Sequence, residues 1–175
     1  ISFIFMIIIL SKVLGTFIYK NEILKFKKFT NKNITKKYLR WINNKELMKY
    51  SRQRHHTHNK STVKRYIKSM SNNWFLAVSI KKKNSFRHIG NISVNFDDKD
   101  MSASISILIG SVDFRNLGLG KVIWQEIMKR LSNFKEIKLI KAGTFHKNIP
   151  MIKIFKFSNM KLFKKKSYVY AKKII

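Results

Sequence analysis

Arg115-Asn116-Leu117-Gly118-Leu119-Gly120-Lys121 is the stretch that decides how this chain folds and what it can bind. Its two glycines let the backbone approach a ligand closely, and a helix that begins here aims unpaired N–H groups at that ligand. The partial positive charge of a helix N-terminus, with the side chains of Arg115 and Lys121, favours an anion. A Walker loop would need Gly-Lys-Ser/Thr and a Rossmann turn a third glycine, so neither alternative fits. The stretch therefore predicts an anion-binding turn.

The segments on either side of this turn have clear periodicities. Ser102 to Ile109 alternates apolar with small polar residues, which predicts a strand. Leu119 to Leu131 carries apolar residues at helical spacing, which predicts an amphipathic helix. This context favours an anion site over an ordinary glycine turn. The expected buried stripe of the helix is Leu119, Val122, Ile123, Ile127 and Leu131, with Lys121, Gln125, Glu126, Lys129 and Arg130 in solvent.

The remaining chain reads as one continuous series of elements. Asn43-Asn44 can split the first helix in two, Ser61 is the expected N-cap of the second, and a polar connection is expected over residues 81–85. The order of strands and helices predicts one mixed α/β sheet with helices on both faces. Strands are expected over residues 22–29, 74–80, 87–96 and 137–145 and near Tyr168, and helices over 35–50, from Ser61 to about Met70, and over 148–158.

Length and composition favour a single domain over residues 20–175. A chain of 175 residues that is 45% hydrophobic can bury one sizeable core. The absence of cysteine excludes a thiolate nucleophile, and it is compatible with a reducing compartment, so we expect a cytoplasmic protein. Residues 1–19 are a hydrophobic segment of uncertain status, too short to span a bilayer stably and without a basic leader. A fragment boundary or non-native extension, with Met6 as a start, is the preferred interpretation; a peripheral membrane anchor is the alternative.

The formal net charge of +30 has two interpretations. A strong positive field attracts polyanions such as nucleic acid or an acidic membrane surface. Against this, Lys dominates over Arg while Ile, Asn and Phe are abundant, as expected from A/T-rich coding DNA. Basic residues also occur in nearly every segment instead of one tail, so we favour the compositional interpretation.

The anion-binding turn and three further segments resemble the GNAT acetyltransferase superfamily, over roughly Glu22 to Tyr170. The turn is similar to its motif A. Lys37-Tyr38-Leu39-Arg40-Trp41-Ile42-Asn43-Asn44 resembles a segment of bacterial amino-sugar and ribosomal-protein N-acetyltransferases. His88-Ile89-Gly90-Asn91-Ile92 is similar to the Ile-Gly strand of those proteins, and Asn148 with Ile154-Phe155-Lys156 to the helix that borders pantetheine.

The resemblance implies a fold and a reaction. The fold would be a mixed, mostly antiparallel sheet with a splayed strand pair that receives acyl-CoA. The backbone of Ile107, Leu108 and Ile109 would pair with the pantetheine arm of acetyl-CoA, and the turn at 115–121 would hold the pyrophosphate. An amine would then attack the thioester directly, with a strand N–H near Leu108 or Ile109 stabilising the oxyanion.

The chain departs from the family where proton transfer is concerned. Many relatives have a Glu at the position of Ser104, and many have a Tyr, able to protonate the thiolate, at the position of Phe155. The usual Gly-Phe after that helix is Asn159-Met160. The candidate bases are therefore His55, His88 and His146, because imidazole titrates near neutrality.

The resemblance also implies the acceptor, with substrate contacts expected from Trp41, Asn43, Asn44, Arg52 and Asn91. The preferred acceptor is a nucleotide-linked amino sugar, and the enzymatic alternative is a protein or ribosomal N-terminal amine. The alternative of another class is a non-catalytic RNA-binding module, although no RNP-like aromatic motif supports nucleic acid as a partner. No metal is expected, since the His55–His58 run has no carboxylate nearby. The sequence leaves open whether the chain forms a homodimer.

Overall fold

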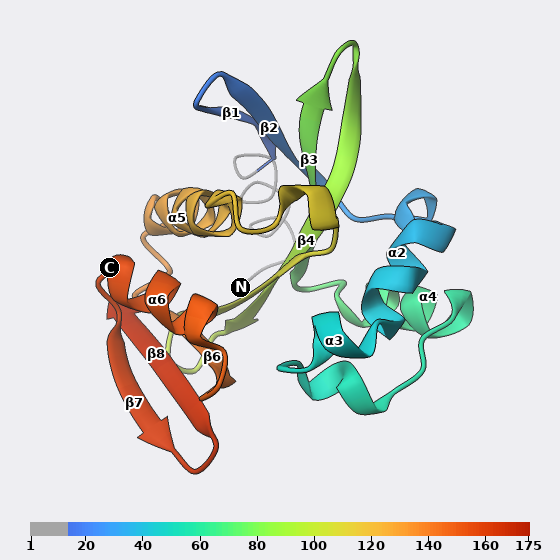
Figure 1. Cartoon of the computed structure of the whole chain (residues 1–175). Helices are drawn as coiled ribbons and strands as arrows, with labels where there is room; N and C mark the ends of the chain where they lie inside the picture. Colours follow the sequence, from blue (N-terminus) through green and yellow to red (C-terminus); the bar gives the residue numbers. More distant parts are fainter. Residues whose placement is uncertain (1–13) are drawn as a thin grey trace.

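An eight-stranded sheet forms the centre of the molecule in the computed structural model, which describes residues 14–175 (Figure 1). The strand order is β1-β2-β3-β4-β5-β6-β8-β7. All neighbouring strands are antiparallel except β5 and β6, which are parallel. The predicted mixed, mostly antiparallel sheet with helices on both faces is confirmed. Within residues 14–175, no helix is long and apolar enough to cross a bilayer.

The elements follow the chain in the expected order, with short helices between β2 and β3. The strands are β1 (Gly15–Tyr19), β2 (Glu22–Lys28), β3 (Trp74–Lys82), β4 (Ser85–Asp97), β5 (Ser102–Ile109), β6 (Leu139–Phe145), β7 (Lys161–Lys165) and β8 (Tyr168–Ile174). The helices are η1 (Asn31–Asn33), α2 (Lys36–Asn43), α3 (Lys45–Met48), η2 (Arg52–His55), α4 (Lys60–Ser69), η3 (Val112–Phe114), α5 (Leu119–Ser132) and α6 (Ile149–Phe157).

Local differences from the sequence-based expectation concern caps, turns and edge strands. Asn59, not Ser61, caps α4, because its side chain accepts the N–H of Thr62. The connection expected over residues 81–85 is a tight hairpin, since β3 and β4 pair as far as Lys82 and Ser85. Strand β7 was not predicted, and neither was β1. A hydrophobic segment was expected over residues 1–19. Residues 1–13 of it lie outside the described residues, and Gly15–Tyr19 at its end form β1.

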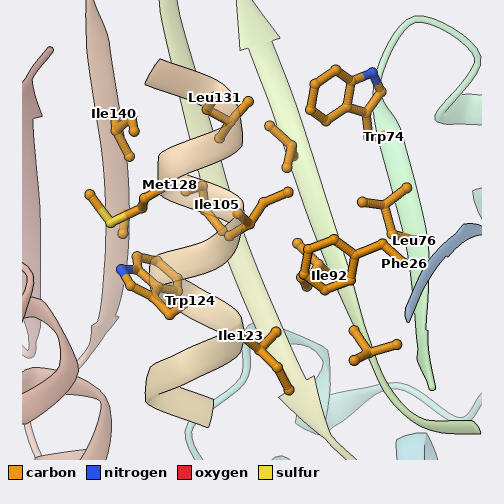
Figure 2. Packing of buried hydrophobic residues seen from close by; sticks show 14 of the residues in the cluster. Phe26, Trp74, Leu76, Ile92, Ile105, Ile123, Trp124, Met128, Leu131 and Ile140 are labelled. Carbon is orange, nitrogen blue, oxygen red and sulfur yellow. The ribbon is translucent and has the colours of Figure 1, made fainter. Parts of the chain in front are cut away.

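Helix α5 packs across one face of the sheet and closes the main core (Figure 2). Trp124 and Met128 are buried in addition to the predicted stripe, while Val122 is only half-buried. The buried arc is therefore wider than predicted, as a helix lying flat on a twisted sheet requires. The core under this helix includes Ile123, Ile127 and Leu131 on α5 and Phe26, Trp74, Leu76, Ile92, Ile105 and Ile140 on the strands.

Glu126 and Arg130, expected in solvent, are half-buried instead. Arg130 Nε donates to Glu126 Oε1 at 2.6 Å, and its guanidinium lies 5.1 Å from the ring of Phe26 and 5.6 Å from that of Phe17. The guanidinium group of Arg130 thus lies over aromatic rings of the β1–β2 hairpin. This polar contact therefore attaches α5 to β1 and β2.

The opposite face of the sheet is covered over β2–β5 by α2 and α4. A second cluster there joins Tyr38, Trp41 and Ile42 of α2 and Val63 of α4 to strand residues such as Phe75. Leu108 of β5 packs against this cluster, whereas Ala103 and Ile105 face α5. The two faces of β5 that the alternation predicted are therefore both covered, one by α5 and the other by the second cluster.

A bulge in β4 fixes the end of β5. Val78 pairs with Gly90 and Ser79 with His88, so Ile89 is an extra residue in β4. The carbonyl of Ile89 accepts the N–H groups of Gly110 and Ser111, at 2.9 and 3.1 Å. The bulge thus holds the first residues of the connection that leads to α5.

We expect Gly90→Ala to destabilise the fold by about 1–3 kcal/mol, because a new methyl group in a packed site must push its neighbours aside. A Cβ at Gly90 would lie 2.2 Å from the carbonyl oxygen of Leu108, which is backbone and cannot rotate away. Denaturant unfolding measures the loss. Gly120→Ala is the matched control, since its Cβ meets only side-chain atoms at 3.7 Å or more; equal losses in both variants would contradict the expectation.

Candidate functional site

Strands β5 and β6 are paired only at their beginnings. The parallel ladder joins Ser102–Ser104 to Leu139–Lys141. Beyond it β5 continues to Ile109 and β6 to Phe145 without pairing with each other. Trp124 of α5 and Phe155 of α6, with ring centroids 5.4 Å apart, line the space that opens there. The structure therefore contains the splayed strand pair that the resemblance implied.

This splay opens into a cavity of about 1080 Å³. Helices α2, α3 and α4 with η2 border it on one side, and β6, β8 and α6 on the other. Its volume is that of a site for a sizeable small molecule. Of the predicted cofactor-binding residues, Ile107, Leu108, Asn148 and Phe155 line it.

The free edge of β5 presents backbone donors and acceptors to this cavity. Leu108 pairs with Asn91 and Ile107 with Ile92 on the β4 side only. Since the N–H and C=O groups of a strand point alternately to its two sides, the groups on the β6 side are left for another partner. Ile109 is not a lining residue; its side chain instead lies 3.9 Å from the place that a Cβ on Gly120 would occupy.

The helix that begins beside this edge has an open N-terminus. Gly118 is the N-cap of α5, with a left-handed φ of 76° and no side-chain cap. The first amide of the helix that has a carbonyl partner is that of Lys121, bonded to Gly118 at 3.1 Å. The amides of Leu119 and Gly120 precede it and are available to a ligand. Asn116, Leu117 and Gly118 are exposed, whereas Gly120 is half-buried and the side chain of Leu119 is buried in the core.

The two charged residues of the turn have different contacts. Arg115 donates through Nε to the carbonyl of Ile109 at 3.2 Å and through Nη2 to that of Gly110 at 2.6 Å. It therefore fixes the end of β5 relative to the turn, in addition to supplying charge. Lys121 Nζ lies 3.8 Å from the ring centroid of Phe157, which makes a cation–π contact between α5 and α6.

Asn148 and Phe155 attach α6 to the site. The Asn148 side chain caps α6 by accepting the N–H of Met151 at 3.4 Å, and it donates to Thr144 Oγ1 at 2.8 Å. Phe155 is fully buried against Trp124. These contacts place the start of α6 at the end of β6, on the far side of the splay from β5.

The three candidate bases lie outside the cavity lining. His88 is half-buried among the rings of Phe29, Tyr38 and Trp41, and its Nε2 bonds the carbonyl of Gly90 at 2.8 Å. His55 is exposed on η2. The ring of His146 bonds the carbonyl of Ser167 at 3.0 Å. Neither His55 nor His146 lines the cavity, whereas two histidines that the sequence did not single out, His56 and His58, do.

Burial lowers the pKa of His88, and the nearby charge of Lys37 acts in the same direction, although the bond to Gly90 opposes both. The unfolded chain then takes up a proton near pH 6.5 that the native His88 resists. The contribution of His88 to stability is complete above that pH and is lost as the pH falls towards the lowered native pKa.

We expect the free energy of unfolding to fall between about pH 7.5 and pH 5.5, and this slope to flatten in His88→Gln, which keeps an N–H donor but does not titrate. Denaturant melts at a series of pH values measure it. His55→Gln controls for removing a surface imidazole. An unchanged slope in His88→Gln would show that this histidine is not the source.

The residues expected to contact the acceptor divide into two groups. Trp41 is buried against Gly110, where an added Cβ would lie 2.1 Å from its ring. Asn43 exchanges two bonds of 2.8 Å with the backbone of His58, and Asn44 caps α3. These three side chains are occupied by the fold, because each satisfies or packs against backbone. Arg52 and Asn91, by contrast, line the cavity.

Three residues that line the cavity have buried polar atoms without a hydrogen-bond partner. Within the part of the chain that the structure describes, Asn91 Oδ1, His58 Nε2 and Trp124 Nε1 are buried without a hydrogen-bond partner, and all three residues are lining residues. Buried polar groups are normally satisfied, so each of these atoms lacks a partner that the described part of the chain does not supply.

The sequence reasoning missed a stripe of small polar residues across β4 and β5. Ser93 pairs with Ser106 and Asn95 with Ser104, and all four line the cavity. The alternation of polar residues in both strands was the signal that could have revealed it. None of the lining residues is Asp or Glu, and no group of three or more His, Cys, Asp or Glu among residues 14–175 is placed to hold a metal ion.

Comparison with known proteins identifies the fold. RimL, a ribosomal L7/L12 α-N-protein acetyltransferase in complex with coenzyme A, superposes with a TM-score of 0.73 at 12% identity, over 87% of this chain and 94% of that chain. The microcin C7 self-immunity acetyltransferase MccE, in complex with acetyl-CoA and AMP, gives 0.71 at 15%, over 87% and 92%. A GNAT-family acetyltransferase from Bacillus anthracis gives 0.70 at 14%, over 86% and 94%.

No family model and no curated protein sequence matches the chain. The structural likeness confirms the GNAT fold that the sequence resemblance implied. At these identities the likeness concerns the fold, and the chemistry must be argued from the site.

Proposed function

We propose that this chain transfers an acetyl group from acetyl-CoA to a primary amine. The observation that carries the proposal is the adjacency of two unpaired backbone surfaces, the β5 edge after Ser104 and the N-terminus of α5 at Gly118. A molecule that combines a diphosphate with a chain containing amides matches both surfaces at once.

The residues present fit the diphosphate end of acetyl-CoA. The amides of Leu119 and Gly120 can donate to phosphate oxygens, and the charge of Lys121 lies beside them. Further positive charge surrounds the connection before the turn, where Lys37, Arg40 and Arg87 line a groove of about 440 Å³ with Arg115. Asp113 in this groove pairs with Arg87, which leaves the groove basic in balance.

The chemistry requires one proton acceptor and one oxyanion donor. The amine nitrogen bonds to the acetyl carbon, the C–S bond breaks, and an N–H of β5 near Leu108 stabilises the oxyanion. Since no carboxylate lines the cavity, we assign His58 to accept the amine proton, directly or through water, because its Nε2 is buried there without a partner. Solvent then protonates the thiolate, since Phe155 cannot donate a proton.

We expect Gly120→Glu to abolish binding of acetyl-CoA, because a carboxylate beside Ile109 and Ile154 would repel the diphosphate and fill the gap between β5 and α6. Isothermal titration calorimetry with acetyl-CoA measures it. Gly120→Ala is the control and should bind within about threefold of the unchanged protein, since its Cβ makes only ordinary contacts. Binding retained in Gly120→Glu would overturn the cofactor assignment.

We expect His58→Gln to lower kcat by about 100-fold while the affinity for acetyl-CoA is kept, as for loss of a general base. His55→Gln, His88→Gln and His146→Gln serve as comparisons, because the sequence favoured those three positions. Steady-state rates over a range of pH measure the effect. If one of the comparison variants loses activity and His58→Gln does not, the base lies elsewhere.

The preferred acceptor remains a nucleotide-linked amino sugar. Support comes from the polar stripe of Asn91, Ser93, Asn95, Ser104 and Ser106, whose amides and hydroxyls can bond the hydroxyl groups of a sugar. The alternative acceptor, a protein N-terminal amine, is favoured by the likeness to RimL, which is named for that activity. Rates with a uridine diphosphate amino sugar and with short peptides bearing free N-termini distinguish the two.

A further inference from the structure

The face of β6, β8 and β7 that continues from the cavity combines aromatic and basic side chains in an ordered array. Cross-strand pairing aligns three rows on this face, because paired residues of antiparallel strands point to the same side. The rows are Lys141, Lys172 and Lys161; Gly143, Tyr170 and Phe163; and Phe145, Tyr168 and Lys165.

The part of this face around Phe163 and Tyr170 is open to solvent, whereas Phe145 and Tyr168 are half-buried next to Tyr50, Arg52 and Arg54. Phe163 is 43% exposed and Tyr170 36% exposed, although both are large hydrophobic side chains. The intervening residues Val169 and Ala171 are buried, and Ala171 belongs to the core cluster under α5. In Figure 1 these strands form the end of the sheet beyond α6, away from α2 and α4. Two large rings are thus exposed on strands whose other face is buried at Val169 and Ala171.

Cations flank the rings. Lys161 Nζ lies 5.6 Å and Lys172 Nζ 5.9 Å from the ring centroid of Phe163. Arg52 lies 5.0 Å from the ring of Tyr168, and this ring is 6.3 Å from that of Tyr170. The array therefore alternates flat apolar rings with positive charge at about the spacing of neighbouring side chains in a sheet.

The charge of this face is unbalanced. None of the three strands contains Asp or Glu. Asp100 pairs with Lys141 at one end of the face, and no carboxylate pairs with Lys161, Lys165 or Lys172 among the ion pairs of residues 14–175. A second copy of this chain would bring the same cations against these ones and be repelled. The face is complementary to a polyanion.

We propose that this face binds single-stranded nucleic acid, with bases stacked on Phe163 and Tyr170 and phosphates near Lys161, Lys165 and Lys172. Exposed rings beside a row of cations are the two components of sequence-tolerant single-strand binding. An acidic peptide or an acidic membrane would use the lysines but would not need flat rings. The proposal goes beyond acetyl transfer and does not depend on it, although Tyr168 and Tyr170 also line the cavity.

Fluorescence anisotropy of labelled 12-mer oligouridylate and oligothymidylate, at several salt concentrations, tests the proposal. We expect Phe163→Ala to weaken binding about fivefold or more, and Phe163→Leu, which keeps apolar volume without a ring, to weaken it similarly. Lys161→Gln with Lys165→Gln should reduce the slope of log affinity against log salt by about 1.4. Comparing the affinities for oligouridylate and oligothymidylate shows whether the face prefers single-stranded RNA or single-stranded DNA.

A matched surface elsewhere on the chain provides the controls. Phe86 on β4 is 39% exposed, and Lys25 Nζ lies 5.1 Å from its ring centroid, so Phe86→Ala removes an equivalent ring beside a lysine. Lys81→Gln with Lys83→Gln removes the same charge from the β3–β4 hairpin. We expect both controls to leave binding within about twofold of that of the unchanged protein.

Three outcomes would overturn the proposal: no binding of either oligonucleotide, equal losses in the controls and the test variants, or polyglutamate competing as effectively as the oligonucleotides. Equal losses would mean that the net charge attracts polyanions everywhere. Effective competition by polyglutamate would identify an acidic-polypeptide surface. Calorimetry with acetyl-CoA on each variant reports the proposed acetyltransferase site separately, so failure of one assignment is distinguishable from failure of the other.

Discussion

The short parallel ladder between Ser102–Ser104 and Leu139–Lys141 is the constraint on which the rest of the structure depends. It holds β5 and β6 in one sheet, and its early end leaves the remainder of β5 without a second neighbour. Unpaired strand backbone inside a protein needs a partner, so the gap specifies a ligand that can supply strand-like hydrogen bonds. The cavity opens where the two strands diverge.

The separation of β5 and β6 is maintained by side chains that line the gap and by hydrogen bonds at its edge. Trp124 and Phe155 occupy the space where continued pairing would bring β6 against β5. Arg115 and the carbonyl of Ile89 fix the connection after β5 by backbone hydrogen bonds. These contacts make the site a consequence of packing on both faces of the sheet.

The strong positive charge has different consequences in different places. On α5, Arg130 is half-buried in an ion pair that attaches the helix to the first hairpin. Near the turn, Lys121 and Arg115 surround a helix N-terminus, where two sources of positive potential add. On β7 and β8, lysines alternate with exposed rings. The register of the strands decides which lysines share a face with aromatic side chains.

Several residues that the sequence marked for function are used by the fold. Trp41 packs on Gly110, Asn43 and Asn44 bond backbone groups, and His88 lies among aromatic rings. Trp41, Asn43 and Asn44 were expected in the site from the resemblance and His88 from its imidazole, and neither reveals whether a side chain points into a cavity or into the core. His58, by contrast, carried no signal beyond its neighbours, because its position follows from the bonds that Asn43 makes to its backbone.

The sequence by itself determined the alternation of β5, the amphipathic helix α5, the glycine turn between them and the order of most other elements, because these depend on local periodicity and on glycine. The tertiary structure alone decided how early β5 and β6 separate, which polar atoms face the cavity, and that the lysines and aromatic residues of β6, β8 and β7 share one face. Those features depend on register between strands that are distant in sequence, and register is fixed only when both faces of the sheet are packed.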